Sequence, residues 1–69
     1  MKELLEALVA EMLEQKVRLG NALEEFEKRF IQTALARTGG NQCKTAALLR
    51  MHRNTLARKI VQYKIKDHR

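Results

Sequence analysis

Proline is absent from this chain of 69 residues, and glycine occurs only three times. Aromatic side chains are also sparse, at 4% of the sequence. Leu, Ala, Glu, Lys and Arg are abundant instead, and this composition favours helix throughout the chain. Repeats, low-complexity tracts and linkers are missing. We therefore expect an all-α fold and a single domain over residues 1–69.

The chain also lacks the residue sets of disulfide-bonded, metal-binding and catalytic proteins. Its single cysteine, Cys43, cannot form a disulfide within the chain. His52 and His68 have no metal-ligand spacing with Cys43 or with each other, so we expect no metal site and no cofactor. A Ser-His-Asp set, paired catalytic carboxylates and a phosphate-binding glycine loop are missing as well. The sequence therefore predicts a protein that is not an enzyme.

No apolar run approaches the roughly 18 residues that a membrane-spanning helix needs. The N-terminal segment, Met1–Lys2–Glu3, carries an acid early and lacks the pattern of a signal peptide. We therefore expect a cytoplasmic protein with no membrane partner. A chain this short buries only about 60% of the surface that its unfolded form exposes, so a monomer would have marginal stability. Oligomerisation is the expected source of additional core.

Charge is divided unevenly along the chain. Residues 1–33 contain seven acids and five Lys or Arg, a net charge of −2, whereas residues 34–69 contain one acid and nine Lys or Arg, a net charge of +8; together they give +6. A basic half joined to a mildly acidic half indicates that one end of the chain contacts a polyanion. The simpler alternative is a solvated basic face.

Two long amphipathic helices are predicted in the first half of the chain. Apolar residues recur at three- and four-residue steps from Lys2 to Leu19, which predicts the first helix. Gly20 is expected to end it with a positive φ angle. Asn21 is expected to cap the second helix, with Glu24 completing a capping box. The Gly39–Gly40 pair ends this second helix.

Helices joined by only one or two residues lie antiparallel as a hairpin. One hairpin cannot cover both of its apolar stripes, whereas two hairpins together form a four-helix bundle. We therefore predict a symmetric homodimer with residues 1–38 as the dimerisation hairpin. The alternative is a monomer whose first helix folds onto the second half of its own chain. The expected interface consists of apolar side chains from both helices: Leu4, Leu5, Leu8, Met12, Leu23, Phe26 and Phe30.

Residues 41–65 have the spacing of a DNA-binding helix-turn-helix. Asn41 is expected to cap a short helix over about 42–49, and a turn over 50–52 leads into a basic helix over about 53–63. A small side chain, Ala46, stands where the two helices cross. The residues expected in the core of the motif are Leu49, Met51, Leu56 and Ile60, with Tyr63 as an apolar cover at its end.

The first turn of the basic helix is where base contacts are expected, because a recognition helix usually enters the major groove with its N-terminus first. Arg53 can pair bidentately with O6 and N7 of guanine, and Asn54 can read adenine or contact the backbone. A second group is expected to contact phosphates from the two helix starts and along the basic helix: Asn41, Gln42, Lys44, Thr55, Arg58, Lys59 and Lys64.

At these residues the chain resembles the Fis family and the similar C-terminal domains of NtrC-like σ54 activators. The resemblance covers residues 21–65 well and rests on Gly40–Asn41–Gln42, Ala46–Ala47–Leu48–Leu49, Arg53–Asn54–Thr55–Leu56 and Lys59–Ile60. It implies a homodimer built from the two leading helices, whose paired motifs bind pseudo-palindromic double-stranded DNA.

The resemblance also implies roles for individual residues. Arg53 matches the principal base-reading arginine of the family, and His52 falls at a position that can also touch bases. The positions that contact the DNA backbone in the family match Asn41, Gln42, Thr55, Arg58 and Lys59.

The chain departs from the Fis pattern at several positions of the motif. Arg50 occupies a turn position where the family usually has glycine; a non-glycine residue with positive φ costs roughly 1 kcal/mol there. Ala57 stands where Fis has a basic residue, and Val61 and Gln62 replace lysines. We therefore expect a weaker hold on flanking phosphates than in Fis and less bending of DNA. The segment 53–56 is closer to the σ54-activator version.

Together these observations predict sequence-specific binding of double-stranded DNA by a homodimer. The expected role is that of the effector domain of a σ54-dependent transcriptional activator, with further domains of a larger regulator as partners. One alternative is a free-standing Fis-like protein of the bacterial nucleoid. An alternative of another class is a helical dimerisation or adaptor module whose basic end binds an acidic protein.

Overall fold

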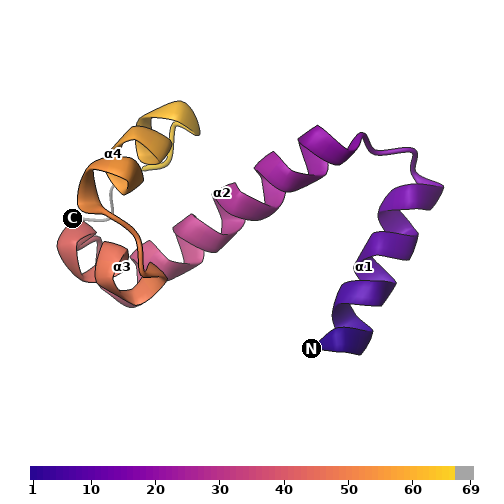
Figure 1. Cartoon of the computed structure of the whole chain (residues 1–69), viewed down its shortest axis with the longest axis horizontal. Helices are drawn as coiled ribbons and strands as arrows, with labels where there is room; N and C mark the ends of the chain where they lie inside the picture. The colour runs from indigo at the N-terminus through magenta and orange to yellow at the C-terminus, as the bar shows by residue number, and fades with distance from the viewer. Residues whose placement is uncertain (67–69) are drawn as a thin grey trace.

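The computed structural model describes residues 1–66; residues 67–69, which include His68, lie outside the described part. Its four helices are α1 (Lys2–Glu14), α2 (Leu19–Arg37), α3 (Gln42–Leu49) and α4 (Arg53–Gln62), and the described residues contain no strand (Figure 1). This confirms the predicted all-α fold, and α3 and α4 form the predicted helix-turn-helix. No helix within residues 1–66 combines the length and the apolar character needed to cross a membrane.

The core lies at one end of the molecule, where α3 and α4 pack against the C-terminal half of α2 (Figure 1). Leu35 and Leu56 are completely buried there. Burying one such side chain contributes about 1.5–3 kcal/mol. The remaining buried apolar residues are Ile31, Ala34, Ala46, Ile60 and Ile65, and the partly buried Leu49, Met51 and Tyr63 pack against them. The predicted core of the motif and the small residue at the helix crossing are therefore confirmed.

The junction between α2 and α3 follows the sequence prediction closely. Gly39 and Gly40 have φ angles of 66° and 85°. The Gly40 N–H donates to the carbonyl of Leu35 at 2.9 Å, which is the long bond of a Schellman motif. Asn41 then caps α3, because its side chain accepts a 2.9 Å hydrogen bond from the Lys44 N–H. Buried Thr45 donates to the Asn41 carbonyl at 2.7 Å and so fixes the start of α3 from inside.

The connection between α1 and α2 differs from the prediction. Helix α1 ends at Glu14, and Lys16 rather than Gly20 has the positive φ angle, 58°. The Val17 N–H donates to the carbonyl of Met12 at 3.0 Å, so a Schellman motif closes α1 at this point. Such a motif satisfies terminal carbonyls and directs an apolar residue back over the last turn. That gain outweighs the strain at Lys16. The helix therefore ends at a place where no glycine marks the end in the sequence.

The predicted start of α2 is wrong for the same reason. Arg18 is the N-cap residue, and no side chain forms a capping hydrogen bond. Gly20 and Asn21 both lie inside the first turn of α2, so the predicted capping box with Glu24 does not form. The two helices are joined by residues 15–18 instead of by one or two residues.

Helix α1 stands apart from the rest of the chain. The chain reverses direction after α1, as expected for a hairpin, but Figure 1 shows the two helices diverging from their connection. No residue of α1 is buried. The radius of gyration is 13.6 Å, against about 11 Å expected for a compact domain of this length. Because α1 lies at the opposite end from α3 and α4, the alternative of a first helix folded onto its own helix-turn-helix is wrong (Figure 1).

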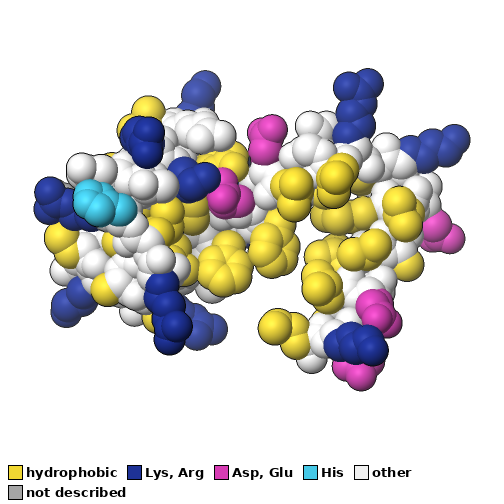
Figure 2. Space-filling model, in the orientation of Figure 1, with side chains coloured by type: hydrophobic (Ala, Val, Ile, Leu, Met, Phe, Trp, Pro, Cys, Tyr) yellow, Lys and Arg dark blue, Asp and Glu magenta, His cyan; other side chains and the backbone are white. Residues whose placement is uncertain are grey.

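The leading helices expose most of their apolar side chains. Of the thirteen exposed large hydrophobic residues within 1–66, eleven lie in the first 30 residues. Figure 2 shows hydrophobic side chains along the inner side of the angle between α1 and α2. Six of the seven predicted interface residues are exposed, and Met12 is half-buried. The single chain therefore leaves this apolar surface uncovered.

Candidate nucleic-acid interface

The turn between α3 and α4 positions α4, which the sequence predicts to be the recognition helix. Arg50 adopts the left-handed conformation with φ of 56°. This agrees with its place at a turn position where the family that the chain resembles usually has glycine. The Met51 N–H donates to the carbonyl of Ala46 at 3.0 Å and closes α3 in a Schellman motif. The turn therefore keeps the geometry of a glycine-containing turn while carrying a bulky residue, at a cost of roughly 1–2 kcal/mol.

His52 is the residue that begins α4. Its ring nitrogen Nδ1 accepts a 3.1 Å hydrogen bond from the Asn54 N–H and thereby caps the helix. A neutral imidazole that accepts at Nδ1 carries its proton at Nε2. His52 is exposed, so its Nε2–H is a donor available to an external acceptor such as a phosphate oxygen or a purine N7. Because the cap occupies Nδ1, the neutral ring can contact an external group only as a hydrogen-bond donor, through Nε2–H.

Arg53 and Asn54 share a concave pocket with the N-terminus of α3. The pocket has a volume of about 600 Å³, and its lining residues are Gly39, Gly40, Asn41, Gln42, Cys43, Arg53, Asn54 and Ala57. Four residues predicted to contact DNA are thus brought together from two helices. Arg53 also donates from Nη1 to the Cys43 Sγ at 3.6 Å, a contact that the sequence did not indicate.

The electrostatics of this pocket favour an anion or an electron-rich base edge. None of its eight lining residues is acidic. The N–H groups at the start of α3 carry the positive end of the helix dipole, and the guanidinium of Arg53 adds a full charge beside them. The pocket therefore has the chemistry of a site for phosphate or for the acceptors of guanine.

The other predicted contact residues lie outside this pocket. Lys44 and Arg58 are exposed, and Thr55 is half-buried. Lys64 follows the far end of α4, where it lines a separate depression of about 370 Å³ with Glu24 and other residues of α2. A helix of ten residues is about 15 Å long, so the structure does not bring Lys64 to the cluster around Arg53.

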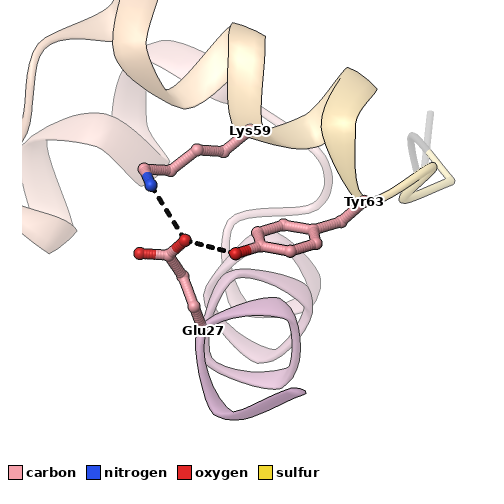
Figure 3. A network of polar contacts seen from close by, with 3 residues as sticks. All are labelled: Glu27, Lys59 and Tyr63. Atoms are coloured by element: carbon pink, nitrogen blue, oxygen red, sulfur yellow. Dashed lines mark hydrogen bonds and ion pairs between the residues drawn. The ribbon is translucent and has the colours of Figure 1, made fainter. Parts of the chain in front are cut away.

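Lys59 is engaged by a residue of α2. Its Nζ lies 2.8 Å from Oε1 of Glu27, and the Tyr63 hydroxyl donates to the same oxygen at 2.6 Å. Figure 3 shows both side chains converging on this one carboxylate, Lys59 from α4 and Tyr63 from the C-cap position that follows it. The Lys59 side chain is 29% exposed, so its ammonium is only partly available to a phosphate.

The network shifts the ionisation of its two acidic groups. The hydrogen bond from Lys59, followed by the one from Tyr63, lowers the pKa of Glu27 below its ordinary value of 4.5. The hydrogen bond to Glu27, followed by burial, raises the pKa of Tyr63 to about 12. Both shifts favour the state in which Glu27 is charged and Tyr63 is protonated, so the network persists over a wide pH range around neutrality.

Sequence reasoning predicted Tyr63 as an apolar cover and did not identify Glu27. The ring of Tyr63 does pack against the core, but its hydroxyl adds the polar contact. The available signal was that Lys59 and Tyr63, four residues apart, share one face of a helix. A carboxylate on the facing helix then completes the set, which no spacing within one helix reveals.

The family model described as "Bacterial regulatory protein, Fis family" matches residues 22–63. The match contains all of α3 and α4 and nearly all of α2, and it leaves out α1. Comparisons with curated proteins and with solved structures find no match. Because the matched residues make up more than half of the chain, this protein belongs to the Fis family of bacterial regulatory proteins, whose helix-turn-helix binds DNA.

Proposed function

We propose that this chain binds specific sequences of double-stranded DNA as a homodimer and is the effector domain of a σ54-dependent transcriptional activator. The observation that carries the proposal is the pocket in which Arg53 and Asn54 meet the N-terminus of α3. A guanidinium group, an amide group and the N-terminus of a helix in one concave surface suit the base edges of a major groove and its phosphates.

Bases are read from the first turn of α4. Two guanidinium N–H groups of Arg53 donate hydrogen bonds to O6 and N7 of a guanine, and Asn54 reads a neighbouring adenine or contacts the DNA backbone. His52 contributes its Nε2–H, because Nδ1 is occupied by the cap. The Cys43 contact supports this assignment, since it restricts the long Arg53 side chain before DNA arrives.

Phosphates are held around these base contacts. Asn41, Gln42 and Lys44 act at the start of α3, and Thr55, Arg58, Lys59 and Lys64 act along α4. Lys59 contributes less than a free lysine, since Glu27 already neutralises much of its charge. Lys64 reaches the backbone at the far end of α4.

The dimer is proposed from the uncovered apolar surface of α1 and α2. The rings of Phe26 and Phe30 form a tilted pair with centroids 5.8 Å apart, yet both residues are about half exposed. A second hairpin placed against this surface covers both stripes and gives two recognition helices related by a two-fold axis. A pseudo-palindromic DNA site follows from that symmetry.

The σ54-activator role rests on the segment 53–56, which resembles that branch more than Fis itself, and on the missing cations at Ala57 and Val61. A free-standing Fis-like protein of the nucleoid is the second candidate. An adaptor for an acidic protein has one observation in its favour, an apolar groove of about 470 Å³ on α2 and α3 that contains Phe26, Phe30 and Leu48 flanked by Arg29 and Arg37.

Selection of bound sequences from a random DNA pool tests the proposal. The selected sites should share a two-fold-symmetric consensus with a guanine in each half. About five or six phosphate contacts per dimer should give log K against log salt a slope near −5. A pool without a consensus, or equal affinity for an acidic polypeptide, would favour the adaptor instead.

A further inference from the structure

The solvent-facing side of α4 carries an apolar strip beside the pocket. Arg53, Ala57 and Val61 are spaced by four residues and therefore lie along one side of the helix. Ala57 lines the pocket together with Arg53. Val61 is 76% exposed, and within residues 31–66 only Leu48 is another exposed large hydrophobic residue. Val61 therefore places an uncovered apolar side chain on the same side of α4 as Arg53.

The surroundings of this strip indicate what covers it. Arg53 and Arg58 are exposed on the same helix, and α4 contains no acidic residue. Of the acids in α2, Glu27 bonds Lys59 and Tyr63, and Glu24 lies near Tyr63 and Lys64 beyond the end of α4. Neither acid lines the pocket that Arg53 and Ala57 share. An apolar protein surface placed here would leave the arginines without counter-charge. The edge of the major groove supplies phosphates at its rim and, at each thymine, an apolar 5-methyl group inside it.

We infer that Ala57 and Val61 are specificity-determining residues that select thymine through contact with its 5-methyl group. This inference rests on the proposed function and names part of its target. Four residues of α-helix rise about 6 Å, so Ala57 lies one turn beyond Arg53 and faces a base pair near the guanine that Arg53 reads. Val61 faces a position farther along the groove.

The size of the expected effect follows from the burial of one methyl group. Removing a buried methyl from an interface reduces affinity about fourfold. The two residues therefore favour thymine over cytosine at their positions without donating any hydrogen bond.

Deoxyuridine substitution in the selected site tests this inference, because deoxyuridine keeps the pairing edge of thymine and lacks only the methyl. Each thymine is replaced in turn, and the affinity of the full chain is measured. The Kd should rise about fourfold at one or two thymines per half-site. Ala57→Gly should abolish the sensitivity at the thymine nearer the guanine, and Val61→Ser at the farther one. Ala36→Gly, at an exposed alanine of α2, is the matched control and should keep both sensitivities.

The outcomes separate this inference from the proposed function. A clear consensus whose thymines all tolerate deoxyuridine overturns the thymine contact and leaves the proposed function intact. A sensitivity that persists in both variants also overturns it, because the methyl then acts through the DNA or another residue. A pool without any consensus overturns both. If Ala57→Gly lowers the melting temperature more than Ala36→Gly does, the Val61→Ser result decides.

Discussion

The hydroxyl of Tyr63, the C-cap residue of α4, donates a 2.6 Å hydrogen bond to the carboxylate of Glu27 in α2. Lys59 approaches the same oxygen at 2.8 Å. The three residues tie the second half of the recognition helix to the helix that carries the exposed rings of Phe26 and Phe30. The orientation of α4 relative to the proposed dimer surface therefore depends on a polar contact as well as on the core.

Replacing Tyr63 with phenylalanine tests the contribution of that contact. Tyr63→Phe keeps the ring that packs on the core and removes the hydroxyl, so the melting temperature at neutral pH should fall. Thermal unfolding followed by circular dichroism measures the change. Glu27→Gln should lower the melting temperature as well. Tyr63→Phe should then lower the melting temperature less in the Glu27→Gln background than in the native chain. Additive losses would show that the two residues act independently.

The network should also give stability a defined pH dependence. Tyr63 has a folded pKa of about 12, above its ordinary 10.0, so its contribution is complete below pH 10 and is lost as pH rises toward 12. Glu27 has a folded pKa below 4.5, so its contribution is present at neutral pH and is lost as pH falls through that lowered pKa. The stability difference between the native chain and Tyr63→Phe should be level between these limits and shrink beyond both. A difference that already changes around pH 7 would contradict the network.

Glycine at position 50 should stabilise the fold. Arg50 holds a left-handed conformation with φ of 56°, and relieving that strain outweighs the added entropy of the unfolded chain. Arg50→Gly should therefore raise the free energy of unfolding by about 0.5–1 kcal/mol, as measured by urea denaturation. The same change at a helical position, Arg58→Gly, should lower it by about 1 kcal/mol. A loss in both variants would show that the turn is not strained.

Two neighbouring cations of α4 should differ in their roles. Arg58 is exposed and forms none of the ion pairs found within residues 1–66, whereas Lys59 is bound to Glu27. Arg58→Ala should make the salt slope of DNA binding shallower by about one and leave folding nearly unchanged. Lys59→Ala should change the slope by less and reduce thermal stability. Equal changes in slope would mean that DNA displaces Glu27 from Lys59.

A charge placed on the apolar surface of α1 should dissociate the proposed dimer. Leu8→Glu places a carboxylate in the stripe and should shift the chain from dimer to monomer in sedimentation equilibrium. Ala10→Glu places the same group on the opposite side of α1 and should leave the mass unchanged. A dimeric Leu8→Glu variant would remove the bundle as the means of association.

The helix-turn-helix was predictable from sequence because its signals are local. Asn41 caps α3, and the Gly39–Gly40 pair ends α2, through contacts within a few residues. The start of α2 was not predictable in this way, because glycine at position 20 suggested a break while the chain ends α1 with a left-handed Lys16. Glycine does not mark a helix end when another residue adopts the left-handed conformation of the Schellman motif.

The candidate site was predictable as a set of residue types and less so as an arrangement. Arg53 and Asn54 do meet the start of α3, which the motif spacing implies. The engagement of Lys59 depends on Glu27, which lies 32 residues away in the sequence. Contacts of that range are decided by how α4 crosses α2, and hydrophobic periodicity does not specify which polar side chains such a crossing brings together.

The proposed role of Arg53 is to read a base in a specific DNA site. Its most direct test is the ratio of the affinities for the selected site and for a scrambled site, measured at one salt concentration for the native chain, Arg53→Ala and Arg58→Ala. Arg53→Ala should lose about 1–3 kcal/mol of binding free energy on the selected site. On the scrambled site it should lose only about what one phosphate contact contributes, so the ratio of the two affinities should collapse. Arg58→Ala should weaken both and preserve the ratio. A ratio that survives in Arg53→Ala would contradict the placement of the recognition helix.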